Sequence, residues 1–400
     1  MVASEYDLGL TSIGMFRGPA EVLIGDGSTG EIGSMIDGWA LGPGPVLLVC
    51  DGTVAELGLA THVTQAMASG PHRIDVFDQI ASEPDLATAT AVIEKVRSDD
   101  YVAVIGLGGG SSLDLAKLAA GLATNAGDVL DAVGVDRLTD QGLPLLLVPT
   151  TAGTGAEATR VSMISHEGEK RIINDVRLIA RGVALDPTLI SSLPPSVTAS
   201  TGMDALTHAI EAALSTNATA LSTRASFEAV ELLSDSLPRS YHNGEDLRAR
   251  RGCLVGSYLA GLALNAGSIL GHSMGYTIAN RVQVPHGVSV AMALPYCIAY
   301  AASASEDRIR SLFNRAGPAP REHEDIYAWI DALLRELDVP TSLRSLGLSQ
   351  SDATEMANEC VDRYPRPNNP TPLEADRLTD LYRFFWQGDI RGAVSAFATT

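Results

Sequence analysis

Short apolar runs alternate with stretches of helical periodicity along the first half of the chain. The runs predict buried strands at residues 45–50, 73–77, 101–105 and 144–149. Apolar residues recur at helical spacing up to residue 68, then over residues 85–98 and 112–123. Strands of four to six apolar residues that alternate with helices predict a parallel sheet covered on both faces.

The second half has a different pattern. After residue 195 almost every apolar position follows the helical period, and we expect helices at residues 196–214, 219–237, 247–266, 286–302, 306–315 and 324–337. Four hundred residues exceed what one hydrophobic core usually fills. The sequence therefore predicts an α/β parallel-sheet domain over residues 1–193 and an all-α domain over residues 194–400.

Charge and composition remove several classes of function. The formal net charge of −20 repels a phosphate backbone or an anionic membrane, so we expect neither nucleic acid nor a membrane as partner. The uncharged stretch from Gly252 to Gly271 reaches the length of a membrane span, but its glycines favour a buried helix. The four cysteines form no C-x-x-C pair, and no signal peptide is predicted. These features indicate a cytoplasmic protein.

A glycine turn follows the third predicted strand. Gly108, Gly109, Gly110 and Ser111 lead into a helix, an arrangement that lets backbone N–H groups approach a phosphate. The alternative is a tight turn in which Ser111 or Ser112 caps the helix.

Two further segments also suit a ligand that carries phosphate and ribose groups. Asp51 follows the first predicted strand, where a carboxylate accepts hydrogen bonds from an adenosine ribose and repels a 2′-phosphate. This favours NAD over NADP, although Asp-Gly is also a common turn. Thr150, Thr151 and Thr154 follow the fourth strand, at the sheet edge where open α/β sheets bind ligands.

Four residues in the helical half suit a metal. Asp204 and His208 are four residues apart on one helix face, and His272 and His286 lie among glycines and apolar residues. One carboxylate and three imidazoles suit iron, zinc, nickel or cobalt better than calcium or magnesium. Alternatively, each of these buried polar groups pairs within the core.

Together these motifs resemble the iron-containing (group III) alcohol dehydrogenases. The similar segments are residues 108–117, 149–157 and 186–211, and His272 followed by Pro285-His286-Gly287. The resemblance implies a dehydroquinate synthase-like fold, a homodimer, and NAD-linked conversion of a small alcohol to its aldehyde or ketone, with NADP left open. It implies Fe²⁺ or Zn²⁺ as a Lewis acid on the substrate oxygen.

The resemblance also assigns residues. The implied cofactor-binding residues are Asp51, Gly108, Gly109, Gly110, Ser111, Asp114, Thr150, Thr151 and Thr154. The implied metal ligands are Asp204, His208, His272 and His286.

Two features depart from the family or add to it. Tyr276 stands where the family usually has a histidine beside the substrate, which changes the proton route and favours aldehyde reduction. Arg160 follows the threonine-rich loop, and we expect it to pair with an anionic group of the substrate. The alternative for Arg160 is a surface salt bridge.

Other functions on this fold remain open. A hydroxyacid–oxoacid transhydrogenase would retain its NAD. A sugar-phosphate cyclase-type lyase usually carries glutamate where this chain has Asp204, and maleylacetate reductases often have altered metal positions. A binding protein with a disabled site is the fourth alternative.

Overall fold

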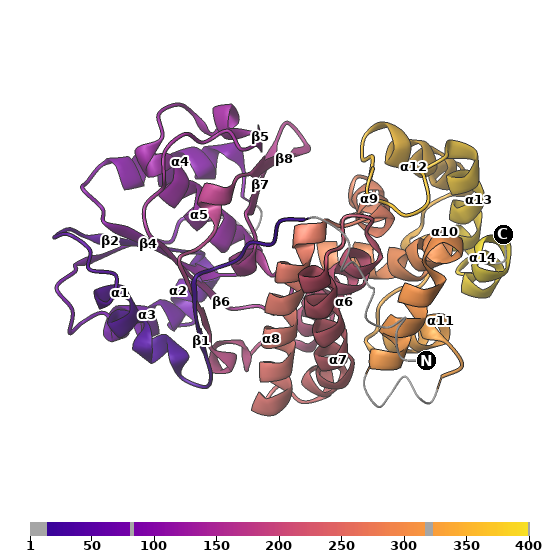
Figure 1. Cartoon of the computed structure of the whole chain (residues 1–400), viewed down its shortest axis with the longest axis horizontal. Coiled ribbons are helices and arrows are strands. Elements are labelled where there is room, and N and C mark those ends of the chain that lie inside the picture. Colours follow the sequence, from indigo (N-terminus) through magenta and orange to yellow (C-terminus); the bar gives the residue numbers. More distant parts are fainter. Residues whose placement is uncertain (1–13, 81–83, 317–322, 399–400) are drawn as a thin grey trace. The chain divides into compact units, whose positions relative to one another are not determined.

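The computed structural model describes residues 14–80, 84–316 and 323–398. The chain divides into two compact units, an α/β unit over Arg17–Ser192 and a helical unit that begins at Leu193. Figure 1 shows the strands in the first unit and long helices in the second. The fold class predicted from the sequence is confirmed.

A six-stranded parallel sheet forms the centre of the α/β unit, in the order β1-β9-β6-β4-β2-β3. Its strands are β1 (Glu21–Ile24), β2 (Val46–Cys50), β3 (Ile74–Phe77), β4 (Ala103–Gly108), β6 (Leu145–Pro149) and β9 (Gly182–Leu185). The four predicted strands are β2, β3, β4 and β6, and the structure adds β1 and β9. Every residue of β2, β4 and β6 is buried, which explains their continuous apolar runs.

Helices cover both faces of this sheet, with α4 and α5 on one face and α1 and α3 on the other (Figure 1). The helices of this unit are α1 (Ile32–Asp37), α2 (Gly52–Glu56), α3 (Leu59–Ala66), α4 (Leu86–Arg97) and α5 (Gly110–Thr124). Ile36 of α1 and Val63 of α3 belong to the same buried cluster as Leu48 and Ile105 of the sheet.

A second, smaller sheet was not predicted. It has the order β5-β8-β7, formed by β5 (Gly134–Val135), β7 (Val161–His166) and β8 (Glu169–Asn174). Strands β7 and β8 form an antiparallel hairpin. Burial alternates along β7, so its sequence mixes polar and apolar residues and gives no continuous apolar run.

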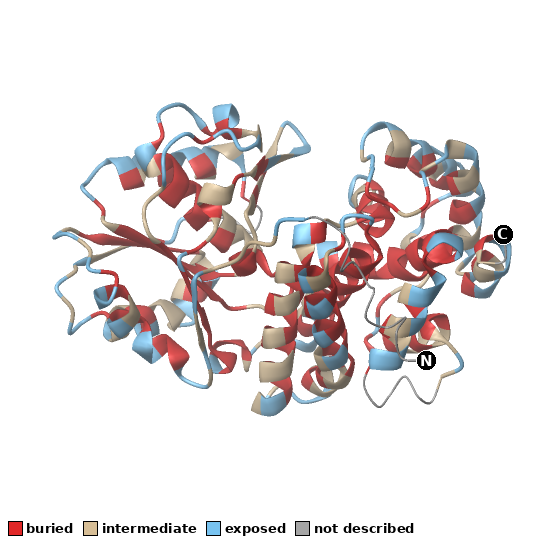
Figure 2. Cartoon of the chain, in the orientation of Figure 1, coloured by how far each residue is buried: buried red, intermediate tan, exposed pale blue. Residues whose placement is uncertain are grey.

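The helical unit is built around α6 and α10, which are mostly buried (Figure 2). Its helices are α6 (Pro195–Leu214), α7 (Ala220–His242), α8 (Leu247–Ala263), α9 (Leu270–Ala279), α10 (His286–Arg315), α11 (Ile326–Glu336), α12 (Gln350–Asp362), α13 (Ala375–Gln387) and α14 (Ile390–Phe397). The interruption predicted after residue 302 appears inside α10 as a kink at Ser305, which has φ −140°. Helices α9, α12, α13 and α14 were not predicted.

The uncharged stretch from Gly252 to Gly271 is not one straight helix. The chain bends by 107° between Leu247–Ala266 and Leu270–Ala279. Helix α10 is also long and apolar enough to cross a membrane, but 83% of its most apolar window is buried inside the structure. Burial against the other helices accounts for the apolar character of α10.

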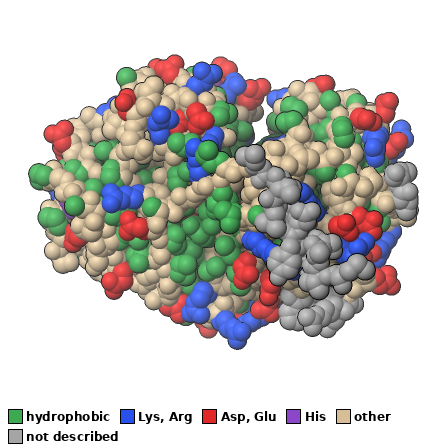
Figure 3. All heavy atoms as spheres, in the orientation of Figure 1, with side chains coloured by type: hydrophobic (Ala, Val, Ile, Leu, Met, Phe, Trp, Pro, Cys, Tyr) green, Lys and Arg blue, Asp and Glu red, His purple; other side chains and the backbone are tan. Residues whose placement is uncertain are grey.

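Both acidic and basic side chains lie on the face shown in Figure 3. The excess of acid is a property of the whole sequence, with 48 Asp and Glu against 28 Lys and Arg. A bound anion therefore needs a local cation to offset the field of the protein.

Candidate functional site

The glycine turn lies at the carboxyl end of β4, near the centre of the sheet. Gly108 has a φ of +148°, and a Cβ there would lie 2.6 Å from the Ser112 side chain, so only glycine fits. Helix α5 begins at Gly110 with Gly109 as its N-cap, so capping by Ser111 or Ser112 is not what the structure has. No side chain caps this helix, which leaves its N-terminus suited to an anion.

Asp51 lies beside this turn, at the end of the neighbouring strand β2. Its Oδ1 accepts a hydrogen bond from Val54 N at 2.9 Å as the N-cap of α2, and its Oδ2 accepts one from Ser112 Oγ at 3.0 Å. Strand β2 lies between β3 and β4, so the chain passes from β2 to its neighbour on one side and then crosses to its neighbour on the other side. Asp51 and the glycine turn therefore flank a topological switch point, the usual ligand position in such sheets.

The threonine loop packs on the same glycines. Thr150 N donates to Gly108 O at 2.9 Å. A Cβ at Gly109 would lie 3.5 Å from Thr151 Oγ1, and one at Gly110 would lie 2.9 Å from Thr154 Cγ2. Three segments predicted separately thus meet at one edge of the sheet.

Asp114 lies behind the turn. Its Oδ2 accepts a hydrogen bond from Met163 N at 3.0 Å, and its Oδ1 lies 3.6 Å from Nζ of the fully buried Lys117. Lys117 also donates to Val161 O at 2.7 Å. Burial raises the pKa of Asp114 to about 6. These contacts join α5 to β7, and direct contact between Asp114 and a cofactor stays a prediction.

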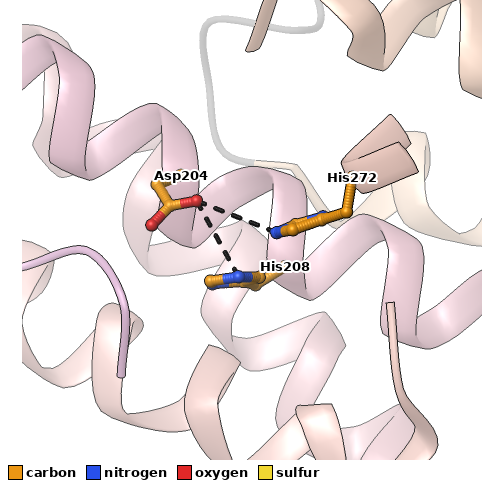
Figure 4. Close-up of side chains that lie close together, drawn as sticks. All are labelled: Asp204, His208 and His272. Carbon is orange, nitrogen blue, oxygen red and sulfur yellow. Dashed lines mark ion pairs between the residues drawn. The ribbon is translucent and has the colours of Figure 1, made fainter. Parts of the chain in front are cut away.

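The four predicted metal ligands come together in the helical unit, on three helices. Asp204 and His208 lie on α6, His272 on α9, and His286 at the start of α10. Asp204 Oδ1 lies 3.8 Å from His208 Nε2, 4.0 Å from His272 Nε2 and 3.8 Å from His286 Nε2. Figure 4 shows Asp204, His208 and His272 converging.

The chemistry of this set fits a divalent metal. Ligand atoms about 2.1 Å from a tetrahedral ion lie about 3.4 Å apart, a little closer than these distances. Asp204 Oδ1 and His272 Nε2 are buried, and neither has a hydrogen-bond partner among the described residues. Such groups are costly to bury unless something binds them. The His286 side chain is 42% exposed, against 9% or less for the other three, so the site is open on that side.

Glu211 holds His272 in place from the side away from Asp204. Its Oε2 pairs with His272 Nδ1, and its Oε1 accepts backbone N–H groups of Ile269 and His272, each at 3.2 Å. Burial raises the pKa of Glu211 and lowers the pKa of His272. A neutral His272 that donates from Nδ1 directs the Nε2 lone pair toward Asp204, as a metal ligand requires.

Both halves of the chain are similar to one known family. Residues 19–187 match the iron-containing alcohol dehydrogenases, and residues 198–386 match the C-terminal part of the Fe-containing alcohol dehydrogenase family. The two matches cover most of both units. The chain belongs to the iron-containing alcohol dehydrogenase family. It is an oxidoreductase that acts on alcohols.

Individual members of the iron-containing alcohol dehydrogenases are similar over nearly the full chain. Long-chain-alcohol dehydrogenase 1 of Geobacillus thermodenitrificans is 36% identical over 361 residues, which cover 88% of this chain and 91% of the relative. A solved 1,3-propanediol oxidoreductase superposes with a TM-score of 0.87 at 26% identity, covering 94% of this chain and all of the other. The NAD⁺ complex of sulfoacetaldehyde reductase from Bifidobacterium kashiwanohense gives 0.84 at 26% identity, covering 94% and 99%.

Tyr276, at the position where iron-containing alcohol dehydrogenases usually have histidine, lies against the predicted ligands. Its ring stacks on His286, with centroids 5.7 Å apart and planes 18° apart, and meets His272 edge-on at 6.4 Å. Burial raises the pKa of Tyr276, and the nearby Arg366 opposes that shift. Tyr276 is therefore protonated at neutral pH, and its role as a proton donor stays a prediction.

Arg160 has partners within the α/β unit. Its Nε donates to Asn174 Oδ1 at 2.5 Å, and its Nη2 lies 3.6 Å from Asp136 Oδ1. These contacts join the start of β7 to the end of β8. They match the alternative of a surface salt bridge, and pairing of Arg160 with a substrate anion stays a prediction.

Sequence reasoning missed two residues of the site, Glu211 and Arg366. Glu211 was noticed only as part of the motif on α6, because a lone glutamate three residues after a histidine has no distinctive pattern. Arg366 gave no signal at all, since it stands between Pro365 and Pro367 in a segment without periodicity.

Proposed function

We propose that this protein is a metal-dependent, NAD-linked alcohol dehydrogenase or aldehyde reductase that acts on a small alcohol or aldehyde by hydride transfer. The observation that carries the proposal is the placement of three imidazole nitrogens within 4.0 Å of one buried carboxylate oxygen. The names of relatives, an NAD-dependent methanol dehydrogenase of Bacillus methanolicus among them, support the cofactor.

Each group has a task in this proposal. A divalent metal, Fe²⁺ or Zn²⁺, held by Asp204, His208, His272 and His286 would polarise the substrate oxygen as a Lewis acid. Glu211 holds the His272 ring in its binding tautomer. Tyr276 supplies a proton near the substrate oxygen during aldehyde reduction. The glycine turn and the uncapped N-terminus of α5 bind the pyrophosphate and orient the nicotinamide for hydride transfer.

The first test is NADH oxidation by purified protein with short aldehydes, before and after removal of metal by a chelator. We expect turnover to disappear with the metal and to return on addition of Fe²⁺ or Zn²⁺. Turnover that is indifferent to metal loss would contradict the proposal. NAD that remains bound through purification, together with exchange between a hydroxyacid and an oxoacid, would favour a transhydrogenase instead.

We expect Asp51 to set the choice between NAD and NADP. Asp51→Asn keeps the N-cap of α2 and removes the charge that repels a 2′-phosphate. The ratio of kcat/KM for NADPH to that for NADH should rise about tenfold, the effect of removing roughly 1.4 kcal/mol of repulsion. Asp78→Asn, at an exposed position after β3, is the charge control. An equal change of this ratio in both variants would show a general effect of charge, and not a contact between Asp51 and the cofactor.

The remaining parts of the proposal rest on the family resemblance for the oligomeric state, and on charge and cysteine content for the location and the excluded partners. We propose a homodimer in the cytoplasm, with a small molecule as its substrate and without nucleic acid or membrane as a partner. Sedimentation velocity of the purified protein measures directly whether it is a dimer.

A further inference from the structure

Arg366 is an arginine that neither the sequence motifs nor the proposed reaction uses. It lies in the segment between α12 and α13, and its Cζ is 5.9 Å from the centroid of the Tyr276 ring. Its Nε donates to Ser273 Oγ at 3.0 Å, and Ser273 directly follows His272. Arg366 therefore contacts Tyr276, which lies against two of the predicted ligands, and Ser273, which follows His272 on the same helix.

The segment that carries Arg366 is held firmly. Asn368 Nδ2 donates to Ser215 Oγ and to Ser268 O, each at 3.0 Å, and Thr216 N donates to Asn368 O at 2.9 Å. These bonds tie the segment to the end of α6 and to the residues before α9. Prolines on both sides of Arg366 restrict its backbone further. A binding group needs this kind of support if it is to hold its position.

Arg366 has no salt bridge to a residue that the structure describes. Among the described residues no carboxylate forms an ion pair with its guanidinium, whereas Arg281, just after α9, pairs with Glu359 at 2.9 Å. Arg366 is near enough to Glu211 to oppose the rise in the pKa of Glu211. The Glu211 carboxylate, however, pairs with His272 and not with Arg366. Arg366 is only partly exposed, so its field is less screened by water than that of a surface arginine.

Arg366 is linked to the most exposed of the predicted ligands through one aromatic ring. His286 is the exposed ligand, Tyr276 stacks on His286, and Arg366 follows on Tyr276. A substrate whose oxygen is at the predicted metal position enters past the exposed His286. We infer that Arg366, whose guanidinium lies over the neighbouring Tyr276 ring, reaches the far end of a short substrate.

We propose that Arg366 binds an anionic group, a carboxylate or a sulfonate, at the far end of a short aldehyde or alcohol substrate. This inference rests on the proposed function and names its substrate class. A guanidinium presents a planar pair of N–H donors that matches two oxygens of such a group. In a protein of net charge −20, a cation beside the site that has no ion pair with any described residue gives an anionic substrate a favourable local potential.

A purely structural role for Arg366 predicts something different. If its contacts with Ser273 and Tyr276 only position Tyr276, its loss lowers the reduction of every aldehyde alike. Binding of an anion lowers the reduction of anionic aldehydes selectively, mainly through KM. The ratio of kcat/KM for anionic aldehydes to that for neutral aldehydes therefore distinguishes the two roles.

The experiment compares NADH oxidation with succinic semialdehyde and sulfoacetaldehyde against the neutral butanal and propanal. We expect the wild-type protein to prefer the anionic aldehydes. In Arg366→Met the ratio of kcat/KM for anionic to neutral aldehyde should fall about 10- to 100-fold, the size expected for loss of hydrogen bonds between charged groups. Arg366→Lys should lie between Arg366→Met and the wild type, because an ammonium keeps the charge but lacks the planar pair of donors. The two anionic substrates show whether carboxylate or sulfonate is favoured.

Arg363→Met is the matched control. Arg363 lies three residues earlier, is exposed, and stands over the Tyr364 ring at 5.6 Å. Arg363→Met changes the net charge by the same amount as Arg366→Met, so its ratio of kcat/KM for anionic to neutral aldehyde should stay at the wild-type value. The metal content measured in each variant shows whether the ligand set is intact. An equal loss for anionic and neutral aldehydes in Arg366→Met overturns the proposal and leaves the function standing. Absence of turnover with every aldehyde in the wild-type protein overturns both.

Discussion

Replacing Asp204 by asparagine is expected to lower kcat/KM for aldehyde reduction by about a thousandfold or more. Asp204 is the anion of the predicted ligand set, and its Oδ1 is the atom that all three histidines face. Asparagine preserves the size of the side chain but removes the charge that balances a divalent ion in a buried site. The loss corresponds to about 4 kcal/mol, within what a Lewis acid contributes to such a transition state. Metal content by mass spectrometry should fall in parallel.

Asp235→Asn provides the control for that change. Asp235 lies on α7 with 44% of its side chain exposed and pairs with Arg239 across one helical turn. The same loss of one charge there should leave both metal content and turnover unchanged. Full metal content and full activity in Asp204→Asn would remove Asp204 from the ligand set.

Gly287→Ala should destabilise the helical unit and weaken the metal site together. A Cβ at Gly287 would lie 1.9 Å from Ser200 O, a backbone atom of α6 that cannot rotate away. Helices α6 and α10 must separate to admit the methyl group, at a cost of about 3 kcal/mol or more. His286 precedes Gly287, and Asp204 lies one turn after Ser200, so the separation moves one ligand from the others. We expect metal affinity to fall by about 100-fold.

The measurements are the melting temperature and a metal titration. Gly30→Ala is the comparison, because a Cβ at that exposed position meets nothing within 4 Å. It should leave both quantities at the wild-type value. A fall in melting temperature without a fall in metal affinity would show that α10 can shift while His286 keeps its place.

Sequence periodicity predicted every completely buried strand of five or six residues, but it missed β9, which is completely buried and has only four residues. Strands β2, β4 and β6 lie inside the sheet and are apolar throughout, so each gave a clear run. Strand β1 is at an edge and half-exposed, and it has only four residues. On the small sheet, β7 buries alternate side chains and β8 buries only Ile173. Their sequences also suit a loop.

Helix α9 shows a different limit. Glycines at 271 and 275 disfavour a helix by local propensity, yet both lie inside α9. A Cβ at Gly271 would lie 2.9 Å from Glu211 Oε1, and one at Gly275 would lie 2.5 Å from Val290 Cγ1. The glycines are there for close packing, a tertiary cause that local propensity does not report.

Some features of the candidate site could be predicted from the sequence, and others depend on tertiary packing. Residue types and their spacing indicated which four side chains could bind a metal, because Asp204 and His208 share a helix face. The spacing did not indicate that α9 and α10 bring His272 and His286 to the same oxygen, which depends on packing. The contacts of Glu211 and the position of Arg366 depend on tertiary structure alone.

The pairing of β1 with β9 has a consequence for synthesis. Gly27 and Thr29, just after β1, donate backbone hydrogen bonds to Asp186, just after β9, and the first of these joins residues 159 positions apart. A ribosome adding about 5 to 20 residues per second needs roughly 10 to 30 s to cover that distance. During that interval β1 has no strand beside it, and once β6 has been made, the edge that β9 later covers is also unpaired. The nascent chain is therefore most open to aggregation or to chaperone binding before residue 186 emerges, and the α/β unit folds as a whole only afterwards.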